Sequence, residues 1–213
     1  MNFSGLNPDA PAFYAELREN NTKEWWTANK DRYERNVRAP FEAIGDELAG
    51  EFGPVKIFRP YRDVRFSADK SPYKLAIGMV TRSSPAHYLQ LSEDGLMLGG
   101  GLYEATPAML ARFRAIVDDN RLVGDLEATL DEVGDAGFEL MAGDALRTAP
   151  RGFSVDHPHI DLLRLKRLAV SRREPVAEWM WAPGALDDVR DRWRTVSIWC
   201  DWLSENLGDT VGD

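Results

Sequence analysis

Cysteine is almost absent from the sequence: Cys200 is the only one among 213 residues. One cysteine excludes an internal disulfide framework and any zinc site built from cysteines. Apolar runs of membrane-spanning length are missing, and no signal-peptide segment follows Met1, so we expect a cytoplasmic protein that does not associate with membranes. Basic residues are too few to balance the acidic ones, 26 against 35, and the net charge of −9 argues against nucleic acid as a partner.

Apolar residues are plentiful by comparison, at 44% of the chain, and they suffice to bury a core. A length of 213 residues suits one domain, which we expect to span residues 1–213. Helical periodicity predicts three N-terminal helices: Asp9 caps the first, Thr22 caps the second and Pro40 opens the third. Strand-like patterns then follow at residues 56–58, 62–66, 75–81, 87–91 and 96–102, with a hairpin signal at Glu93-Asp94-Gly95.

Helical patterns return in the second half of the chain. Thr106-Pro107 opens one helix, and an apolar stripe predicts a long C-terminal helix over residues 186–207 that places Cys200 in the core. Consecutive strands with short links favour antiparallel pairing. The sequence therefore predicts an α+β fold, in which N-terminal helices and the long C-terminal helix pack on a central, mainly antiparallel sheet. Shorter expected elements are a helix at 123–133, an apolar segment at 138–141, a helical turn at 159–165, a strand at 168–171 and an extended segment around Trp179 and Trp181.

Two stretches of the acidic chain are strongly basic. Residues 54–82 and residues 147–173 each hold seven basic side chains and two acidic ones. If the two stretches meet in space, they form a positive cleft that concentrates the field on an anion. If they lie apart, their cations pair locally with carboxylates.

The densest group of reactive side chains is the run Arg-Asp-Val-Arg-Phe-Ser-Ala-Asp-Lys-Ser-Pro-Tyr-Lys at residues 62–74. Arginine binds carboxylates and phosphates through two parallel hydrogen bonds, and a serine-rich turn adds further donors, so this run suits an anion site. The phosphate-loop motif is absent. The alternative is a purely structural strand and turn, in which Asp63 pairs with an arginine and Asp69 caps the turn.

The run at residues 62–74 resembles the signature of a bacterial and fungal family, the domain of unknown function 2461. Trp26 stands where we would expect phenylalanine, and the resemblance covers nearly the whole chain. It implies a single soluble domain and a fold-level identity, and it implies no mechanism. The other matching pieces are Asn20-Asn21, Trp25-Trp26, Asn29-Lys30, Tyr33, Gly99-Gly100-Gly101 with Tyr103, Pro150-Arg151-Gly152-Phe153, Asp156-His157-Pro158 and residues 162–166.

Three glycines in a row, at residues 99–101, end an expected strand. Glycine permits close approach of the backbone to a ligand, but tight strand packing needs it equally, and we favour the packing role. His157 and His159 flank Pro158, which keeps their backbone extended, so we expect no metal site. His157 suits general acid–base chemistry, although hydrogen bonding within a loop would also explain it.

The leading hypothesis is a basic pocket for a small anion, a phosphate or a carboxylate. If a reaction takes place, Tyr73 and His157 are the candidate catalytic residues for proton transfer, and we expect no cofactor and no metal. The alternative is a non-catalytic interaction module that acts through the tryptophan-rich C-terminal helix. In either case we expect a monomer or a homodimer. The expected ligand-binding residues are Arg62, Arg65, Ser67, Lys70, Lys74, Arg151 and Lys166.

Overall fold

The computed structural model describes residues 3–63, 65 and 69–208. The chain folds into two compact units, each assembled from several segments. Unit 1 comprises residues 1–82, 88–98 and 173–192, and unit 2 comprises residues 83–87, 99–172 and 193–213.

The fold is α+β, as predicted, and its strands form one antiparallel sheet. The strand order in the sheet is β1-β2-β3-β4-β6-β5. The strands are β1 (Val55–Ile57), β2 (Ala76–Thr81), β3 (Ala86–Ser92), β4 (Gly95–Leu102), β5 (Glu139–Leu140) and β6 (Leu168–Pro175). The helices are α1 (Asp9–Glu19), α2 (Lys23–Tyr33), the π-helix η1 (Glu34–Arg38), α3 (Ala39–Phe52), α4 (Pro107–Asp118), α5 (Val123–Asp135), α6 (Ile160–Leu163), the 3-10 helix η2 (Glu178–Trp181) and α7 (Ala185–Leu207).

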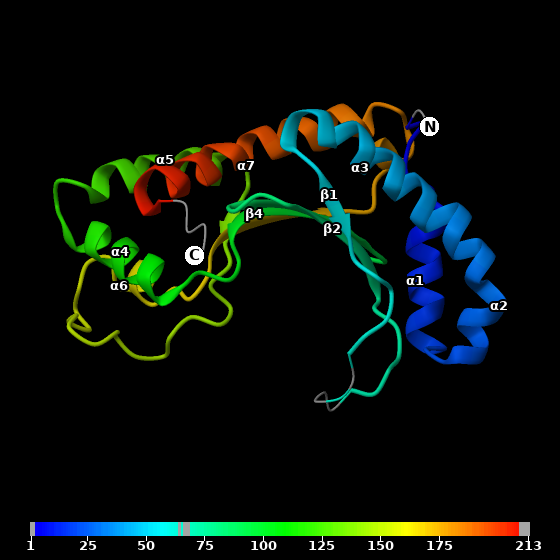
Figure 1. Ribbon diagram of the computed structural model, residues 1–213, viewed down its shortest axis with the longest axis horizontal. Helices are drawn as coiled ribbons and strands as arrows, with labels where there is room; N and C mark the ends of the chain where they lie inside the picture. Colours follow the sequence, from blue (N-terminus) through cyan, green and yellow to red (C-terminus); the bar gives the residue numbers. More distant parts are fainter. Residues whose placement is uncertain (1–2, 64, 66–68, 209–213) are drawn as a thin grey trace. The chain divides into compact units, whose positions relative to one another are not determined.

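The first two helices of unit 1 differ in how their N-termini are capped. The Thr22 hydroxyl accepts a hydrogen bond from the Trp25 N–H, which confirms the predicted cap of α2. Asp9 does not cap α1: the Asn7 side chain accepts the Asp9 N–H, and the Asp9 carboxylate binds Arg32 instead. Helices α1 and α2 lie side by side, and a π-helical turn joins α2 to α3 (Figure 1).

The two faces of the sheet differ within unit 1. Burial alternates along β3, where Leu89 and Leu91 are buried while Tyr88, Gln90 and Ser92 are half-buried. The register pairs Met79 with Leu89 and Gly78 with Gln90, so the apolar side chains of β2 and β3 share one face. Helix α3 packs against β1 and β2 on the apolar side, where the Met79 thioether lies beside Gly45. The opposite face carries Tyr88, Gln90 and Ser92 of β3.

The glycines of β4 serve strand packing in unit 2. A Cβ on Gly100 would lie 2.6 Å from the Ala86 carbonyl oxygen and closer still to a methyl group of Val196. A Cβ on Gly99 or Gly101 would collide with carbonyl oxygens of β6. This confirms the packing interpretation of the triple glycine, because neighbouring backbone and α7 occupy the space on these three residues.

The tryptophans of α7 are buried in the chain itself. Trp193 and Trp199 have no exposed surface and Trp202 is 5% exposed. The Trp199 indole donates to the Leu168 carbonyl at 3.1 Å, and the Trp202 indole donates to the Asp125 carboxylate at 2.8 Å. Cys200 is buried beside them, as predicted. The interaction module expected on this helix therefore loses the aromatic surface on which it depended.

Two further local expectations are wrong. Among the described residues of 62–66 there is no strand; only Tyr61 forms a β-bridge, with Tyr73, while Val64 and Phe66 lie outside the described residues. The segment of Trp179 and Trp181 is a 3-10 helix rather than extended. The hairpin between β3 and β4 does turn at Glu93-Asp94, as predicted. Within the described ranges, none of the helices has the length and hydropathy that crossing a bilayer requires.

Candidate functional site

The cations predicted within residues 62–74 are largely occupied by neighbouring carboxylates. Arg62 forms an ion pair with Asp69, and Arg65, whose side chain is 76% exposed, pairs with Asp63 at 2.7 Å. The Ser71 N–H donates to Asp69, and hydrogen bonds from Ser71 and Arg62 lower the pKa of that carboxyl to about 2. This is the local pairing that the structural alternative expected.

The other predicted residues of the run at 62–74 differ in their exposure to solvent. Lys70 is exposed, and Ser67 lies outside the described residues. Tyr73 is only 4% exposed, its ring stacks on Trp26 with centroids 4.2 Å apart, and burial raises the pKa of its hydroxyl. Such a buried, stacked ring is typical of an anchor in the core.

Lys74 is the residue of the run that reaches a cavity. The backbone N–H of Lys74 donates to the Pro60 carbonyl at 2.8 Å, next to the β-bridge between Tyr61 and Tyr73. These backbone contacts hold Lys74 just before the start of β2. Its ammonium lies 5.3 Å from the centre of the Phe58 ring. Burial there, together with the charge of Arg59, lowers the pKa of the Lys74 amine.

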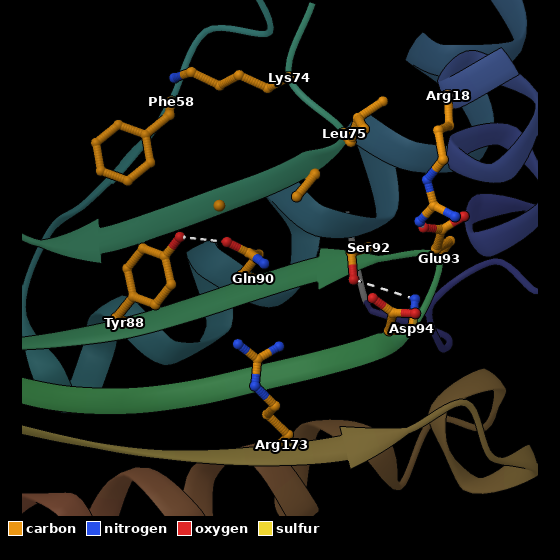
Figure 2. A pocket seen from close by; sticks show the side chains of 12 residues that line it. Arg18, Phe58, Lys74, Leu75, Tyr88, Gln90, Ser92, Glu93, Asp94 and Arg173 are labelled. Carbon is orange, nitrogen blue, oxygen red and sulfur yellow. Dashed lines mark hydrogen bonds and ion pairs between the residues drawn. The ribbon is translucent and has the colours of Figure 1, made fainter. Parts of the chain in front are cut away.

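The cavity has a volume of about 500 Å³ and is built entirely from unit 1. That size lies within the usual range of small-molecule sites, roughly 300–1,000 Å³. Figure 2 shows Arg173 reaching from β6 toward Gln90, with Lys74 and Phe58 on the other side of the cavity. Its lining residues are Arg18, Phe58, Lys74, Leu75, Ala76, Gly78, Tyr88, Gln90, Ser92, Glu93, Asp94 and Arg173.

Hydrogen bonds among the neutral side chains leave donors available to a ligand. The Tyr88 hydroxyl donates to the Gln90 side-chain carbonyl at 2.8 Å, so the Gln90 amide N–H groups are the part left for other contacts. The Asp94 N–H donates to the Ser92 hydroxyl oxygen at 3.2 Å, which leaves the Ser92 O–H as a donor. Both interactions are drawn in Figure 2. Gln90 and Ser92 are two residues apart in β3, so their side chains lie on the same face of the strand. That face lines the cavity, and their available donors therefore lie on the cavity side.

Gly78 keeps the floor of the cavity open. It lies directly opposite Gln90 in the register of β2 and β3. A Cβ at this position would lie 2.9 Å from the Tyr88 hydroxyl oxygen and 3.4 Å from the Phe58 ring. A side chain here would have to displace the Tyr88 hydroxyl, which donates to Gln90.

The cations that line the cavity differ in whether they have an ion-pair partner. Arg18 forms an ion pair with Glu93. Arg173 and Lys74 have no carboxylate within ion-pair distance anywhere in the part of the chain that the structure describes. Arg173 comes from the second basic segment and Lys74 from the first, so the two segments share one cavity through these residues.

The sequence profile of a family described as a conserved hypothetical protein, DUF2461, matches residues 9–202. The chain belongs to the DUF2461 family. This confirms the resemblance carried by residues 62–74 and the pieces around them. Comparison with curated proteins found no match, and comparison with solved structures found none either.

The other predicted site residues of this DUF2461 member belong to unit 2, with Arg151 and Lys166 exposed. His157 accepts the His159 N–H on Nδ1 at 3.1 Å, and its Nε2 lies 3.2 Å from the Asp118 carboxylate. This arrangement fits the neutral tautomer that carries its proton on Nε2. Among the residues described, histidine, cysteine, aspartate and glutamate side chains nowhere gather in a group of three or more that could hold a metal ion.

Sequence reasoning missed most of the polar lining of the DUF2461 cavity. Arg173 lies in the second basic segment but is not among the predicted ligand residues. Gln90 lies in the strand predicted at residues 87–91, and Ser92 follows directly after it. The alternating pattern marks these two positions only as the more exposed face of the observed strand. The available signal is the combination of this alternation with the adjacent hairpin at Asp94-Gly95.

Proposed function

We propose that the cavity of unit 1 binds a small anion, a carboxylate or a phosphate, and that Arg173 is its principal partner. The observation that carries this proposal is a guanidinium without an ion-pair partner among the described residues, facing a cavity whose neutral groups offer donors. Arginine presents several N–H groups in a plane, and such hydrogen bonds to an anion are about twice as strong as neutral ones.

The neighbouring residues complete an anion site of ordinary chemistry. Gln90 supplies amide N–H groups, Ser92 supplies a hydroxyl, and Lys74 adds positive charge from the edge. The lowered pKa of Lys74 follows from burial and from Arg59, and a bound anion would reverse that lowering by stabilising the ammonium. The ion pairs of Arg62 and Arg65 leave those arginines less able to serve the same ligand.

The experiment is a thermal-shift and calorimetric titration of the full chain with inorganic phosphate and with acetate, lactate and succinate. Ligand at about 100 times its dissociation constant stabilises the folded state by about 2.7 kcal/mol. Arg173→Gln should weaken binding by roughly tenfold to a hundredfold, because it removes charge-assisted hydrogen bonds to the anion.

Arg65→Gln is the matched control, since it removes the same charge from an exposed guanidinium in the same unit. It should leave binding unchanged. Equal losses in both variants would point to general charge attraction and contradict the cavity site. Loss in Arg65→Gln alone would move the site back to the run at residues 62–74, and the lack of any shift with all four probes would overturn anion binding altogether.

A further inference from the structure

A second, smaller cavity of about 160 Å³ adjoins the first in unit 1. The two cavities share a polar wall formed by Gln90, Ser92, Asp94 and Arg173. The remaining lining of the smaller cavity is apolar in its side chains: Gly95, Leu96, Met97 and Pro175. Its volume is close to the roughly 150 Å³ that one benzene molecule occupies in an engineered cavity, so its apolar side suits a group of about that size.

The shared wall carries one charge of each sign. The Asp94 carboxylate and the Arg173 guanidinium both border the two cavities, yet the described part of the chain shows no ion pair between them and no other ion pair for either. Opposite charges that line the same space without pairing are both available to one ligand. A ligand that carries both an anionic and a cationic group would satisfy both at once.

Gly95 explains why these charges border the same space. Its φ of +113° lies in the region that favours glycine, and a Cβ there would lie 2.8 Å from the Pro175 carbonyl carbon. A Cβ would also collide with the carbonyl oxygen of Glu174. The hairpin turn can therefore press against the end of β6, which brings Asp94 to the cavities that Arg173 lines.

We propose that the anion bound here is the carboxylate of an amino-acid-like zwitterion with an apolar substituent. Arg173, Gln90 and Ser92 hold the carboxylate, Asp94 holds the ammonium group, and the substituent fills the smaller cavity. The inference rests on the proposed anion site and adds the ligand class. A bare phosphate fits this wall less well, because it is repelled by the Asp94 carboxylate and brings no cationic group to pair with it.

The test compares three compounds that share one apolar group: L-phenylalanine, 3-phenylpropionate, which lacks the ammonium, and phenethylamine, which lacks the carboxylate. Calorimetry at pH 7 should rank phenylalanine first, with the acid roughly tenfold weaker, because a charged hydrogen bond to Asp94 is lost. The same ranking is expected for L-leucine against 4-methylpentanoate and isopentylamine.

Two variants separate the roles of the charges. Asp94→Asn should abolish the preference for phenylalanine over 3-phenylpropionate while the acid still binds, and Arg173→Gln should weaken both. Asp46→Asn is the control, since it removes the same charge from an exposed position on α3 that lines neither cavity.

The outcomes distinguish this inference from the proposed function beneath it. If phenylalanine and 3-phenylpropionate bind equally well to the unchanged chain, or if the preference for phenylalanine survives Asp94→Asn, the zwitterion is excluded and the anion site stands. If neither the acids nor phosphate bind, the anion site itself fails. A preference lost equally in Asp46→Asn would show that net charge, rather than Asp94, sets it.

Discussion

The side chain of Asn21 pairs with both backbone groups of Tyr73. Its amide N–H donates to the Tyr73 carbonyl at 3.0 Å, and its carbonyl accepts the Tyr73 N–H at 3.0 Å. The Asn21 side chain thus makes the two backbone hydrogen bonds that a neighbouring strand would otherwise make to Tyr73, which precedes β2. Trp26 stacks on the Tyr73 ring from the same helical region. Two pieces of the family pattern, around residues 20–33 and at 62–74, therefore meet at Tyr73.

Asn21→Ala should destabilise the protein markedly, because it leaves a partly buried N–H and a partly buried C=O without partners. Such a loss costs about 1–3 kcal/mol, and for a chain of this size each kcal/mol lowers the melting temperature by roughly 2–4 °C. Thermal unfolding followed by circular dichroism measures the effect. Asn20→Ala is the control, since the Asn20 amide donates to an exposed carbonyl of α1. Equal destabilisation by both variants would contradict the anchoring role of Asn21.

Arg32 binds two carboxylates at once and should make stability depend on pH. Its guanidinium donates to Asp9 at 2.6 Å and to Glu16 at 2.7 Å, and these hydrogen bonds lower the pKa of both carboxyls. Because the folded pKa values lie below the ordinary values of 3.8 and 4.5, the stabilisation is complete above pH 4.5 and is lost as the pH falls through the folded values.

Arg32→Gln should therefore lower stability by about 1 kcal/mol at neutral pH, as expected for a partly exposed bidentate pair, and have a smaller effect at pH 2–3. Urea unfolding at a series of pH values measures this convergence. Arg35→Gln is the control, since it removes the same charge from the following helical turn. Within the described part of the chain, Arg35 donates to a backbone carbonyl and to no carboxylate, so its effect should not change with pH in this way. If the effect of Arg32→Gln were constant from pH 7 to pH 2, the carboxylates would not be its partners.

Cys200 should be nearly inert in the folded protein. Burial raises the pKa of its thiol to about 12, with a smaller contribution from Asp201. At pH 8 this leaves roughly a thousandfold less thiolate than in the unfolded chain, where the pKa is near 9, and the thiolate is the reactive form. Ellman's reagent should thus react slowly with the native protein and rapidly in guanidinium chloride. A fast native reaction would place Cys200 outside the core.

Most of the fold could be predicted because its determinants are local. Thr22 and Thr106 cap the helices that follow them, and the hairpin turns at Glu93-Asp94. The expected strand at residues 62–66 is wrong because the alternation of residue types is only one of the local factors that decide the backbone conformation. Asp63 accepts the Arg65 N–H two residues on, and side-chain bonds of this kind compete with strand pairing.

The candidate site could be predicted only in part, since its geometry comes from distant segments. Lys74 can be recognised from its charged surroundings, but the role of Arg173 depends on the position of β6 in the sheet order. Gln90 becomes a donor because Tyr88 occupies its carbonyl, and Asp94 reaches the cavity because Gly95 lets the turn approach β6. Pairing across strands and close backbone approach are tertiary properties that no single-sequence pattern encodes.

Gly100 and Gly50 should respond to alanine in opposite directions. Gly100 faces the Ala86 carbonyl and Val196 so closely that the added methyl group must displace backbone or α7, at a cost of about 1–3 kcal/mol or more. Gly50 lies in α3 with nothing within 4 Å of its Cβ position, and alanine there should stabilise the protein by about 0.5–1 kcal/mol through lower backbone entropy in the unfolded chain. Urea unfolding of both variants measures the contrast. A neutral Gly100→Ala would mean that β4 can move away from its neighbours, and the packing role of the triple glycine would then be wrong.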